Sequence, residues 1–339
     1  MPRQGRIEIP GGVYHVIIRG IERRDLFKDK SDYRQFLVRL EAGLKSWKHQ
    51  CLAWALMPNH VHLLLRQGQA PLSKMMRGLL TGYALYFNHK YKRSGYVYQN
   101  RYKSIMCQED AYLSELIRYI HLNPVRAGIV ASIDVLDAYP WTGHSVISEK
   151  VERGWQSTQE VLSLFGENKK AAWEKYRSFI IDGWNMGKNR MLTGGGLVRS
   201  AGGWQGVMQL KELNERWQGD ERILGDGSFV GNALKTADAK MTQQARLHKD
   251  GWTLETLAEH VCKLLMISLS GLQRRSRNTD ITRARELFCY WAKENLGIDG
   301  QKIASHLKIS KMAVSKNVRK GEEYSYKARL KFTSLQRPL

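Results

Sequence analysis

The pattern of apolar and polar positions over residues 1–145 predicts strands and helices that alternate along the chain. Strand-like apolar runs occupy 13–18, 51–57, 60–66 and 97–107. Helical periodicity occupies 31–47, 72–91 and 110–122. The order strand, helix, strand, strand, helix, strand, helix predicts an α+β fold, namely a ferredoxin-like split βαβ domain with an antiparallel sheet and one extra helix.

Local signals mark the ends of several of these elements. Ser31 is the expected N-cap of the first helix, because its hydroxyl can accept a hydrogen bond from the first turn. The turn dipeptide Pro58-Asn59 separates two apolar runs, which therefore read as adjacent strands. The last helix should end before Pro124, since the residue preceding a proline resists helical geometry.

The pattern after residue 145 divides the rest of the chain into two regions. Residues 146–250 read as a poorly defined connecting region that is partly helical, with one helix expected over 169–184. Glycines at 194–196 and 202–203 interrupt the helical pattern. A phosphate-binding loop would need a following Gly-Lys-Ser or Gly-Lys-Thr, which is absent, so a flexible turn is the preferred interpretation.

Residues 251–339 are expected to form a helical DNA-binding domain of the helix-turn-helix type. Helices are predicted over 281–295 and 301–307, and a third begins at Ser310 after a tight turn. The apolar positions that such a core needs are Ile303, Ala304, Leu307, Ile309, Val314 and Val318. The exposed face of the third helix would carry Lys311, Ser315, Lys316, Arg319 and Lys320. A plain basic helical bundle is the alternative.

The charge balance indicates a polyanionic partner. The 339 residues include 54 Lys and Arg against 32 Asp and Glu, a formal net charge of +22. Residues 271–339 hold 16 basic and 6 acidic residues, a net +10, so nearly half of the excess lies in this last fifth. Nucleic acid is favoured over a membrane surface as the partner.

Other features of the composition favour a cytoplasmic protein. There is no apolar stretch of about twenty residues to span a bilayer, and the basic start leads into no apolar signal core. The four cysteines are scattered without a Cys-x-x-Cys pair, so they are expected to be reduced.

Candidate chemistry begins with the segment 58–65, Pro-Asn-His-Val-His-Leu-Leu-Leu. Side chains alternate between the faces of a strand, so His60 and His62 point the same way and can share one metal ion. Two imidazole ligands suit a divalent metal and leave positions for phosphate oxygens. A His-x-His on an apolar strand is more often structural, so this pattern alone leaves metal binding open.

A second candidate pair lies on the helix predicted over 110–122. Tyr119 and Asn123 are four residues apart, hence one turn apart and on the same side of the helix. Tyrosine can act as a nucleophile, and the amide oxygen of asparagine is a hard ligand that can complete a metal site. The alternatives are a boundary tyrosine with a hydrated hydroxyl and an asparagine that ends the helix.

Residues 1 to about 145 resemble the HUH single-tyrosine transposases and, within them, the REP-associated tyrosine transposases. The matching segments are Ile9-Pro10-Gly11-Gly12-Val13-Tyr14-His15-Val16, Met57-Pro58-Asn59-His60-Val61-His62, Tyr98-Gln99-Asn100-Arg101-Tyr102 and Tyr119-Ile120-His121-Leu122-Asn123-Pro124-Val125-Arg126-Ala127-Gly128. The resemblance implies that His60 and His62 bind Mg²⁺ or Mn²⁺ and that Tyr119 attacks DNA. It makes Asn123 the third ligand, where several relatives have glutamine.

The implied activity is metal-dependent cleavage and strand transfer on single-stranded or hairpin DNA through a 5′-phosphotyrosine, with no small-molecule substrate. A catalytically inactive DNA-binding regulator derived from a transposase is the alternative. A replication initiator or a relaxase shares this chemistry. Relaxases place the tyrosine before the histidine pair, whereas here it follows, which favours the transposase type. The resemblance favours a bacterial, nucleoid-associated monomer over a dimer.

Basic residues interleaved with tyrosines suggest where unpaired bases would stack. Arg101 and Lys103 are the expected DNA contacts, among tyrosines at 83, 86, 91, 96, 98 and 102 and basic residues at 90, 92 and 93. Core tyrosines on a solvated helix end are the alternative. Residues 254–321 resemble the helix-turn-helix domain of the replication initiator DnaA, but the Arg-Asp-His-Thr-Thr of that initiator is absent, so its DNA sequence cannot be transferred.

Overall fold

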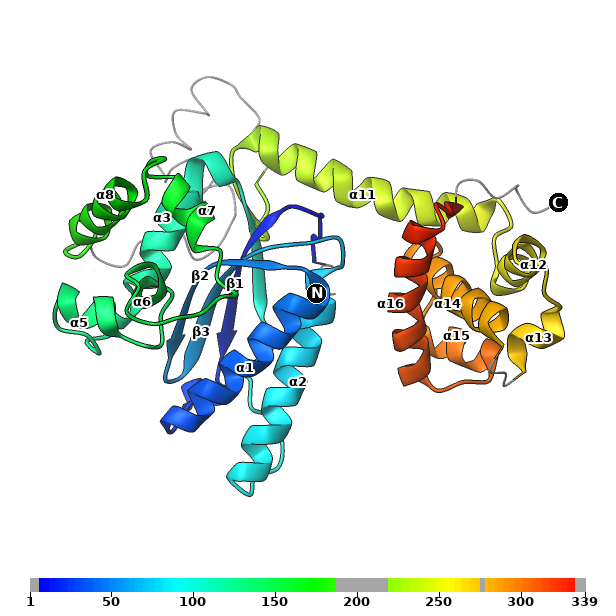
Figure 1. The fold of residues 1–339 in the computed structure, drawn as a ribbon, viewed down its shortest axis with the longest axis horizontal. Helices are drawn as coiled ribbons and strands as arrows, with labels where there is room; N and C mark the ends of the chain where they lie inside the picture. Colours follow the sequence, from blue (N-terminus) through cyan, green and yellow to red (C-terminus); the bar gives the residue numbers. More distant parts are fainter. Residues whose placement is uncertain (1–5, 187–218, 275–277, 333–339) are drawn as a thin grey trace. The chain divides into compact units, whose positions relative to one another are not determined.

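The computed structural model describes residues 6–186, 219–274 and 278–332 (Figure 1). The chain divides into two compact units, residues 1–237 and 238–339, and each is described by itself. The glycine-rich segments at 194–196 and 202–203 lie outside the described residues. None of the described helices is both long enough and apolar enough to cross a bilayer.

A five-stranded sheet forms the centre of the first unit. Its strands are β1 (Val13–Arg19), β2 (Gln50–Met57), β3 (His60–Arg66), β4 (Lys103–Cys107) and β5 (Ile223–Leu224). The order across the sheet is β2-β3-β1-β4-β5, and the first four strands pair antiparallel. The predicted α+β split βαβ fold is therefore confirmed. The short strand β5, which the sequence did not predict, adds to this antiparallel sheet by pairing parallel with β4.

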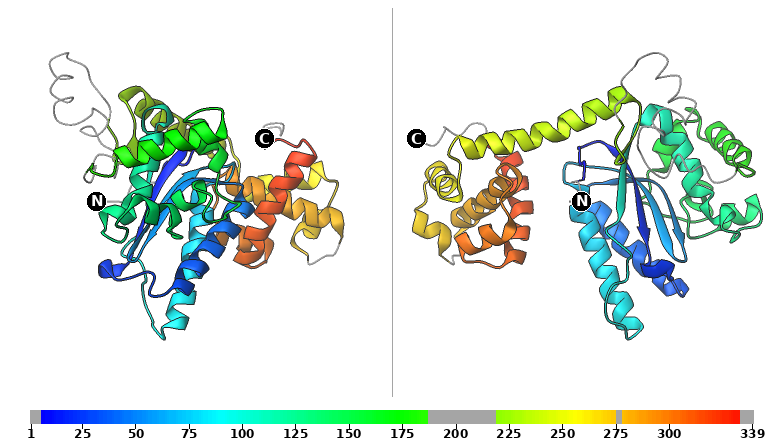
Figure 2. Two further views of the ribbon diagram at one scale, coloured as in Figure 1. Left: turned by 60° about the vertical axis from the view of Figure 1, so that its left-hand side comes forward. Right: turned by 180° about the vertical axis from the view of Figure 1, so that it is seen from behind.

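Helices cover both faces of this sheet (Figures 1 and 2). One face packs against α1 (Lys30–Trp47) and α2 (Leu72–Lys90). The other packs against α3 (Glu109–His121) and a group of shorter helices. These are α4 (Asn123–Arg126), α5 (Ile133–Ala138), α6 (His144–Ile147), α7 (Thr158–Ser163) and α8 (Lys169–Asp182).

The alternation of side chains along β1 explains the two faces. Tyr14, Val16 and Ile18 belong to the core under α1 and α2, whereas Val13 and Ile17 belong to the core under α3. Both cores are built from buried aliphatic and aromatic side chains, so the sheet is apolar on both sides. A short 3₁₀ helix, η1 (Ile21–Arg23), follows β1.

Two predicted boundaries differ from the structure. The N-cap of α1 is Asp29 rather than Ser31, because the Asp29 carboxylate accepts hydrogen bonds from the backbone N–H groups of Ser31 and Asp32. The predicted strand over 97–107 is shorter than expected and begins at Lys103. In the preceding segment, 97–102, Tyr98 forms an isolated antiparallel bridge with Gly20.

The region after residue 145 continues the first unit. The predicted boundary between 145 and 146 falls inside α6. From α7 and α8, Val161, Ala172 and Tyr176 are buried in the core under α3. Helix α11 (Gly227–Lys249) contains the boundary between the units, and its Val230 is buried in the core under α1 and α2.

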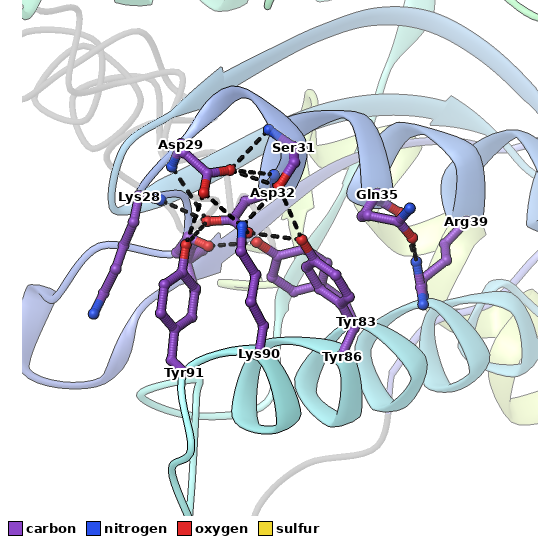
Figure 3. Close-up of polar contacts among 11 residues, drawn as sticks. Lys28, Asp29, Ser31, Asp32, Gln35, Arg39, Tyr83, Tyr86, Lys90 and Tyr91 are labelled. Carbon is purple, nitrogen blue, oxygen red and sulfur yellow. Dashed lines mark hydrogen bonds and ion pairs between the residues drawn. The ribbon is translucent and has the colours of Figure 1, made fainter.

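A buried carboxylate joins the start of α1 to the end of α2 (Figure 3). The Asp32 side chain accepts hydrogen bonds from the Lys90 ammonium group at 2.7 Å, the Tyr86 hydroxyl at 2.9 Å and the Tyr91 hydroxyl at 2.7 Å. The backbone N–H of Lys28 donates to it as well, at 2.8 Å. Asp32 is fully buried, so these donors replace the water that its charge would otherwise need.

This network corrects the expectation that the tyrosines near the end of α2 stack on bases. Tyr83 is fully buried and donates to the carbonyl of Leu26. The hydroxyl groups of Tyr86 and Tyr91 donate hydrogen bonds to Asp32 (Figure 3). Among these tyrosines only Tyr96 is widely exposed, at 82%. The tyrosine spacing reflects core packing and a polar bridge between two helices rather than a row of stacking platforms.

His49 gives the first unit a testable acid sensitivity. Its Nδ1 accepts the backbone N–H of Gly68 at 2.9 Å, which requires a neutral ring, and burial lowers the pKa of His49 to about 4. The unfolded chain binds this proton near pH 6.5, so the free energy of unfolding is highest above that pH and falls as the pH drops toward 4. The contribution of His49 to this loss should reach about 3 kcal/mol.

Urea unfolding of the wild type and of His49→Asn between pH 7 and pH 4 checks this. The asparagine oxygen can accept from Gly68 but does not titrate, so the variant should show a flatter pH dependence. His89→Asn, at an exposed position on α2, is the matched control and should follow the wild type. Parallel curves for wild type and His49→Asn would contradict the prediction.

The second unit is helical. Its helices are the end of α11, α12 (Leu254–Leu264), α13 (Leu269–Gln273), α14 (Thr279–Glu294), α15 (Gly300–Leu307) and α16 (Lys311–Lys327). Of the six apolar positions predicted for its core, five are buried and Ile309 is partly buried. Lys308 ends α15 in the left-handed conformation, and the Ser310 hydroxyl caps α16 by accepting from Ala313 at 3.1 Å. The three predicted helices therefore form where the sequence places them.

Candidate active site

The register of β1 and β3 places four polar side chains on one face of the sheet. Arg19 lies directly opposite His60, and Ile17 lies opposite His62. Directly opposite residues in an antiparallel pair share a face, and every second residue along a strand does too. His15, Arg19, His60 and His62 therefore lie on the face that α3 covers.

The two histidines predicted as metal ligands are neighbours. Their ring centroids are 5.1 Å apart. Nδ1 of His60 lies 2.7 Å from the amide oxygen of Asn59, and Nδ1 of His62 lies 2.8 Å from Nε2 of His15. Each ring is thus oriented through its Nδ1.

Helix α3 brings Tyr119 to this pair. Four apolar side chains bury one side of the helix against the sheet: Leu113, Leu116, Ile117 and Ile120. The Tyr119 side chain is 8% exposed. Its ring meets His62 edge-on, with 5.8 Å between the ring centroids. The structure therefore brings together Tyr119 and the histidine pair, which are far apart in the sequence.

The surroundings shift the pKa values of both groups. Burial lowers the pKa of His62 well below its usual value, and the nearby His15, His60 and Arg19 act in the same direction. Burial raises the pKa of Tyr119, while the positive charges of Arg126 and Arg19 oppose that rise. His62 is consequently neutral at neutral pH, the form in which an imidazole can bind a metal ion.

Asn123 is the first residue of α4, and its side chain contacts the last turn of α3. Its amide nitrogen donates to the carbonyl oxygens of Tyr119 at 2.9 Å and Ile120 at 3.3 Å. These contacts correspond to the helix-terminating role that the sequence left open for this residue. Its role as the third metal ligand remains a prediction that depends on its amide oxygen.

Two further residues, His15 and Arg126, lie at the site although their sequence pattern did not mark them as candidates. His15 is fully buried and bonds to His62, and it is the one imidazole within the apolar strand β1, a signal that could have been followed. The guanidinium of Arg126 lies 5.1 Å from the centre of the Tyr119 ring and donates to the Tyr119 carbonyl at 3.0 Å. Its Nε is buried with no hydrogen-bond partner in the described part of the chain.

The predicted DNA contacts fall into two groups. Arg101 and Lys103 are exposed, and Lys103 lies opposite Ile17 on the face that carries His62. The other five residues lie in the second unit on the exposed side of α16: Lys311, Ser315, Lys316, Arg319 and Lys320. In residues 6–186, 219–274 and 278–332 no group of three or more His, Cys, Asp or Glu could hold a metal ion. Any ion bound by His60 and His62 must therefore take other donors.

One protein-family model matches the part of the chain that carries this site. The matching family model is described as "Transposase IS200 like". The model matches residues 10–123. That segment contains the candidate nucleophile, the histidine pair and Asn123.

One solved structure similar to this chain is described as "Structure of the REP associates tyrosine transposase bound to a REP hairpin". It is 18% identical in sequence, the match covers 47% of this chain and 90% of that chain, and the TM-score is 0.37. A search of curated proteins finds no match.

A chain of buried polar groups lies on the far side of α3 in the first unit. Two residues after the candidate nucleophile, Nδ1 of His121 lies 2.8 Å from the Tyr176 hydroxyl. That hydroxyl also lies 2.8 Å from Nδ1 of His144, whose Nε2 is 2.7 Å from the Asp137 carboxylate. Arg177 completes the chain by donating to the same carboxylate at 3.1 Å. These bonds tie the end of α3 to α5, α6 and α8.

Proposed function

We propose that this chain is a metal-dependent single-strand DNA endonuclease and strand transferase that acts through a 5′-phosphotyrosine. The observation that carries the proposal is the packing of the Tyr119 ring against His62, within a segment that matches the IS200-like transposases. A nucleophile, a pair of imidazoles and an arginine side chain meet there on one face of the sheet.

The residues present fit a divalent ion. Asn59 holds Nδ1 of His60 through an amide oxygen that can only accept, so the lone pair of His60 is on Nε2. His60 and His62 would hold Mg²⁺ or Mn²⁺ through their Nε2 atoms, with the Asn123 amide oxygen as the proposed third donor. When bound, such an ion polarises a phosphate oxygen and neutralises charge that develops on it.

The protein side of the reaction rests on Tyr119. Its phenolic oxygen attacks the phosphorus in line, the bond from phosphorus to the 3′ oxygen breaks, and the phosphate stays linked to the tyrosine. The phenol gives up its proton and the departing 3′ oxygen takes one up, so no nucleotide cofactor is needed. Because burial disfavours the phenolate, the positive charges of Arg126 and Arg19 are proposed to offset part of that cost.

The proposed substrate is single-stranded or hairpin DNA. Arg101 and Lys103 would contact its backbone next to the catalytic face, and the exposed Tyr96 offers one ring on which a base can stack. The chain is proposed to act as a monomer on DNA, with no small-molecule substrate.

Incubation of the full chain with labelled single-stranded hairpins and Mn²⁺ tests the proposed activity. The expected products are a shortened strand with a free 3′-hydroxyl and a covalent protein–DNA adduct that resists denaturation. Peptide mass spectrometry should locate the adduct on Tyr119. Binding of the hairpins without cleavage or adduct would overturn the enzymatic proposal and favour the inactive DNA-binding regulator.

The second unit is proposed to anchor the protein to duplex DNA through α16. Lys316 and Arg319 are exposed on that helix and are three residues apart, hence on the same side of it. Each phosphate contact by a basic side chain steepens the dependence of log affinity on log salt by roughly 0.9 on duplex DNA. Replacing both residues with glutamine should therefore weaken duplex binding and flatten the slope by about 1.8.

A salt titration of duplex affinity by fluorescence anisotropy measures this effect. The matched control replaces Lys249 and Lys263, two exposed lysines on other helices of the same unit, with glutamine. Both double variants lose two charges, so an equal loss of slope in the two would show that α16 makes no specific contact.

A further inference from the structure

His15 is a fully buried histidine that contacts both parts of the candidate site. Its Nε2 lies 2.8 Å from Nδ1 of His62, and the two rings stack with centroids 5.1 Å apart. It also meets the Tyr119 ring edge-on, with 6.0 Å between centroids. In the register of the sheet, His15 and His62 are diagonal neighbours on one face, since Ile17 is the residue directly opposite His62.

A hydrogen bond between two neutral imidazoles needs one N–H group and one lone pair. If Nδ1 of His62 donates, the lone pair of His62 is on Nε2, where it can bind a cation. If His15 donates instead, His62 carries its proton on Nε2 and cannot bind a cation there. The direction of this one hydrogen bond therefore decides whether His62 can act as a ligand.

The neighbouring ligand indicates the direction. The amide oxygen of Asn59 accepts from Nδ1 of His60, so His60 presents a lone pair on Nε2. Two imidazoles that bind one ion from the same face need matching lone pairs. His62 matches His60 only when its Nδ1 donates to His15.

We propose that His15 is a positioning residue: it accepts the Nδ1–H of His62 and so fixes the orientation and the tautomer in which His62 binds the metal through Nε2. The proposal rests on the proposed function, because it takes His62 as a metal ligand. His15 does not touch the substrate in this scheme. Outer partners of metal-binding histidines typically contribute about 10- to 100-fold to metal affinity.

Mn²⁺ titration of the full chain, followed by the electron paramagnetic resonance signal of the free ion, tests the role of His15. His15→Leu removes the acceptor and should weaken Mn²⁺ binding by about 10- to 100-fold. His15→Gln offers a side-chain oxygen near the position of Nε2 and should retain most of the affinity. Ile105→Val is the matched control, because Ile105 lies directly opposite His15 in β4 and is equally buried.

A change in packing alone would affect the three variants through their stability and not through Mn²⁺ affinity. Thermal unfolding and near-ultraviolet circular dichroism identify such a change. If His15→Leu folds and binds Mn²⁺ as the wild type does, the role of His15 is overturned. If the wild type itself does not bind Mn²⁺, the metal site in the proposed function fails, which is a different result.

The tautomers can also be read in the metal-free wild type, should His15→Leu fail to fold. Nitrogen NMR of the chain labelled at histidine distinguishes protonated from unprotonated ring nitrogens, and His15→Gln supplies the assignment. At neutral pH, His62 should be protonated at Nδ1, and Nε2 of His15 should be unprotonated. The opposite pair of tautomers would overturn the proposal without any variant having to fold.

Discussion

Replacing Tyr119 with Phe is expected to abolish DNA cleavage and adduct formation, with a loss of at least about 10⁴-fold in rate. The substitution removes only the phenolic oxygen, and the ring that packs against His15 and His62 remains. Binding of hairpin DNA should therefore be nearly unchanged. Single-turnover cleavage and binding of the same labelled hairpin measure the two properties side by side.

Tyr112→Phe is the matched control, because Tyr112 lies on the same helix and is partly buried in the same core. It should cleave as the wild type does. Cleavage by Tyr119→Phe together with inactivity of Tyr112→Phe would move the nucleophile to Tyr112 and contradict the proposed arrangement.

Chelation of divalent ions should also reduce the rate of DNA cleavage strongly. EDTA is expected to reduce cleavage by at least about 10³-fold, since the ion supplies several kcal/mol of charge stabilisation, and added Mn²⁺ should restore it. His60→Ala and His62→Ala should lose metal-dependent cleavage to a similar extent, because each removes one of two imidazoles that share a face.

His89→Ala, at an exposed position on α2, controls for the loss of an imidazole elsewhere and should retain activity. Full cleavage in EDTA by the wild type would remove the metal from the mechanism. Loss of cleavage in the histidine variants with full cleavage in EDTA would instead assign His60 and His62 a structural role.

The sequence predicted those parts of the fold that depend on regular periodicity. The runs 51–57 and 60–66 are strands with nearly the expected bounds, because Pro58-Asn59 permits only a tight connection between them. The position of His60 and His62 on one face followed from the alternation of the strand. The approach of Tyr119 depended on the apolar side of α3, which is also periodic.

Other features depend on contacts that periodicity does not encode. The strand β5 has two residues, too few for any alternation, and comes more than a hundred residues after its partner β4. Asp29 caps α1 in place of Ser31, because two residues that can both act as caps stand two positions apart and the path of the backbone decides between them. The tyrosines at 86 and 91 looked like a binding surface, but they satisfy a buried carboxylate on another helix.

The hydrogen-bonded network that holds His121 at the end of α3 also affects the position of Tyr119 on the same helix. Successive residues on a helix are about 100° apart, so a helix held at His121 is also held in rotation at Tyr119, two residues earlier. In the proposed reaction, folding rather than the arriving DNA would therefore set the position of the Tyr119 phenol. If Tyr119 is the nucleophile, as proposed, the conformational entropy of aligning it is lost during folding, before any strand binds, and this would lower the barrier to the first chemical step.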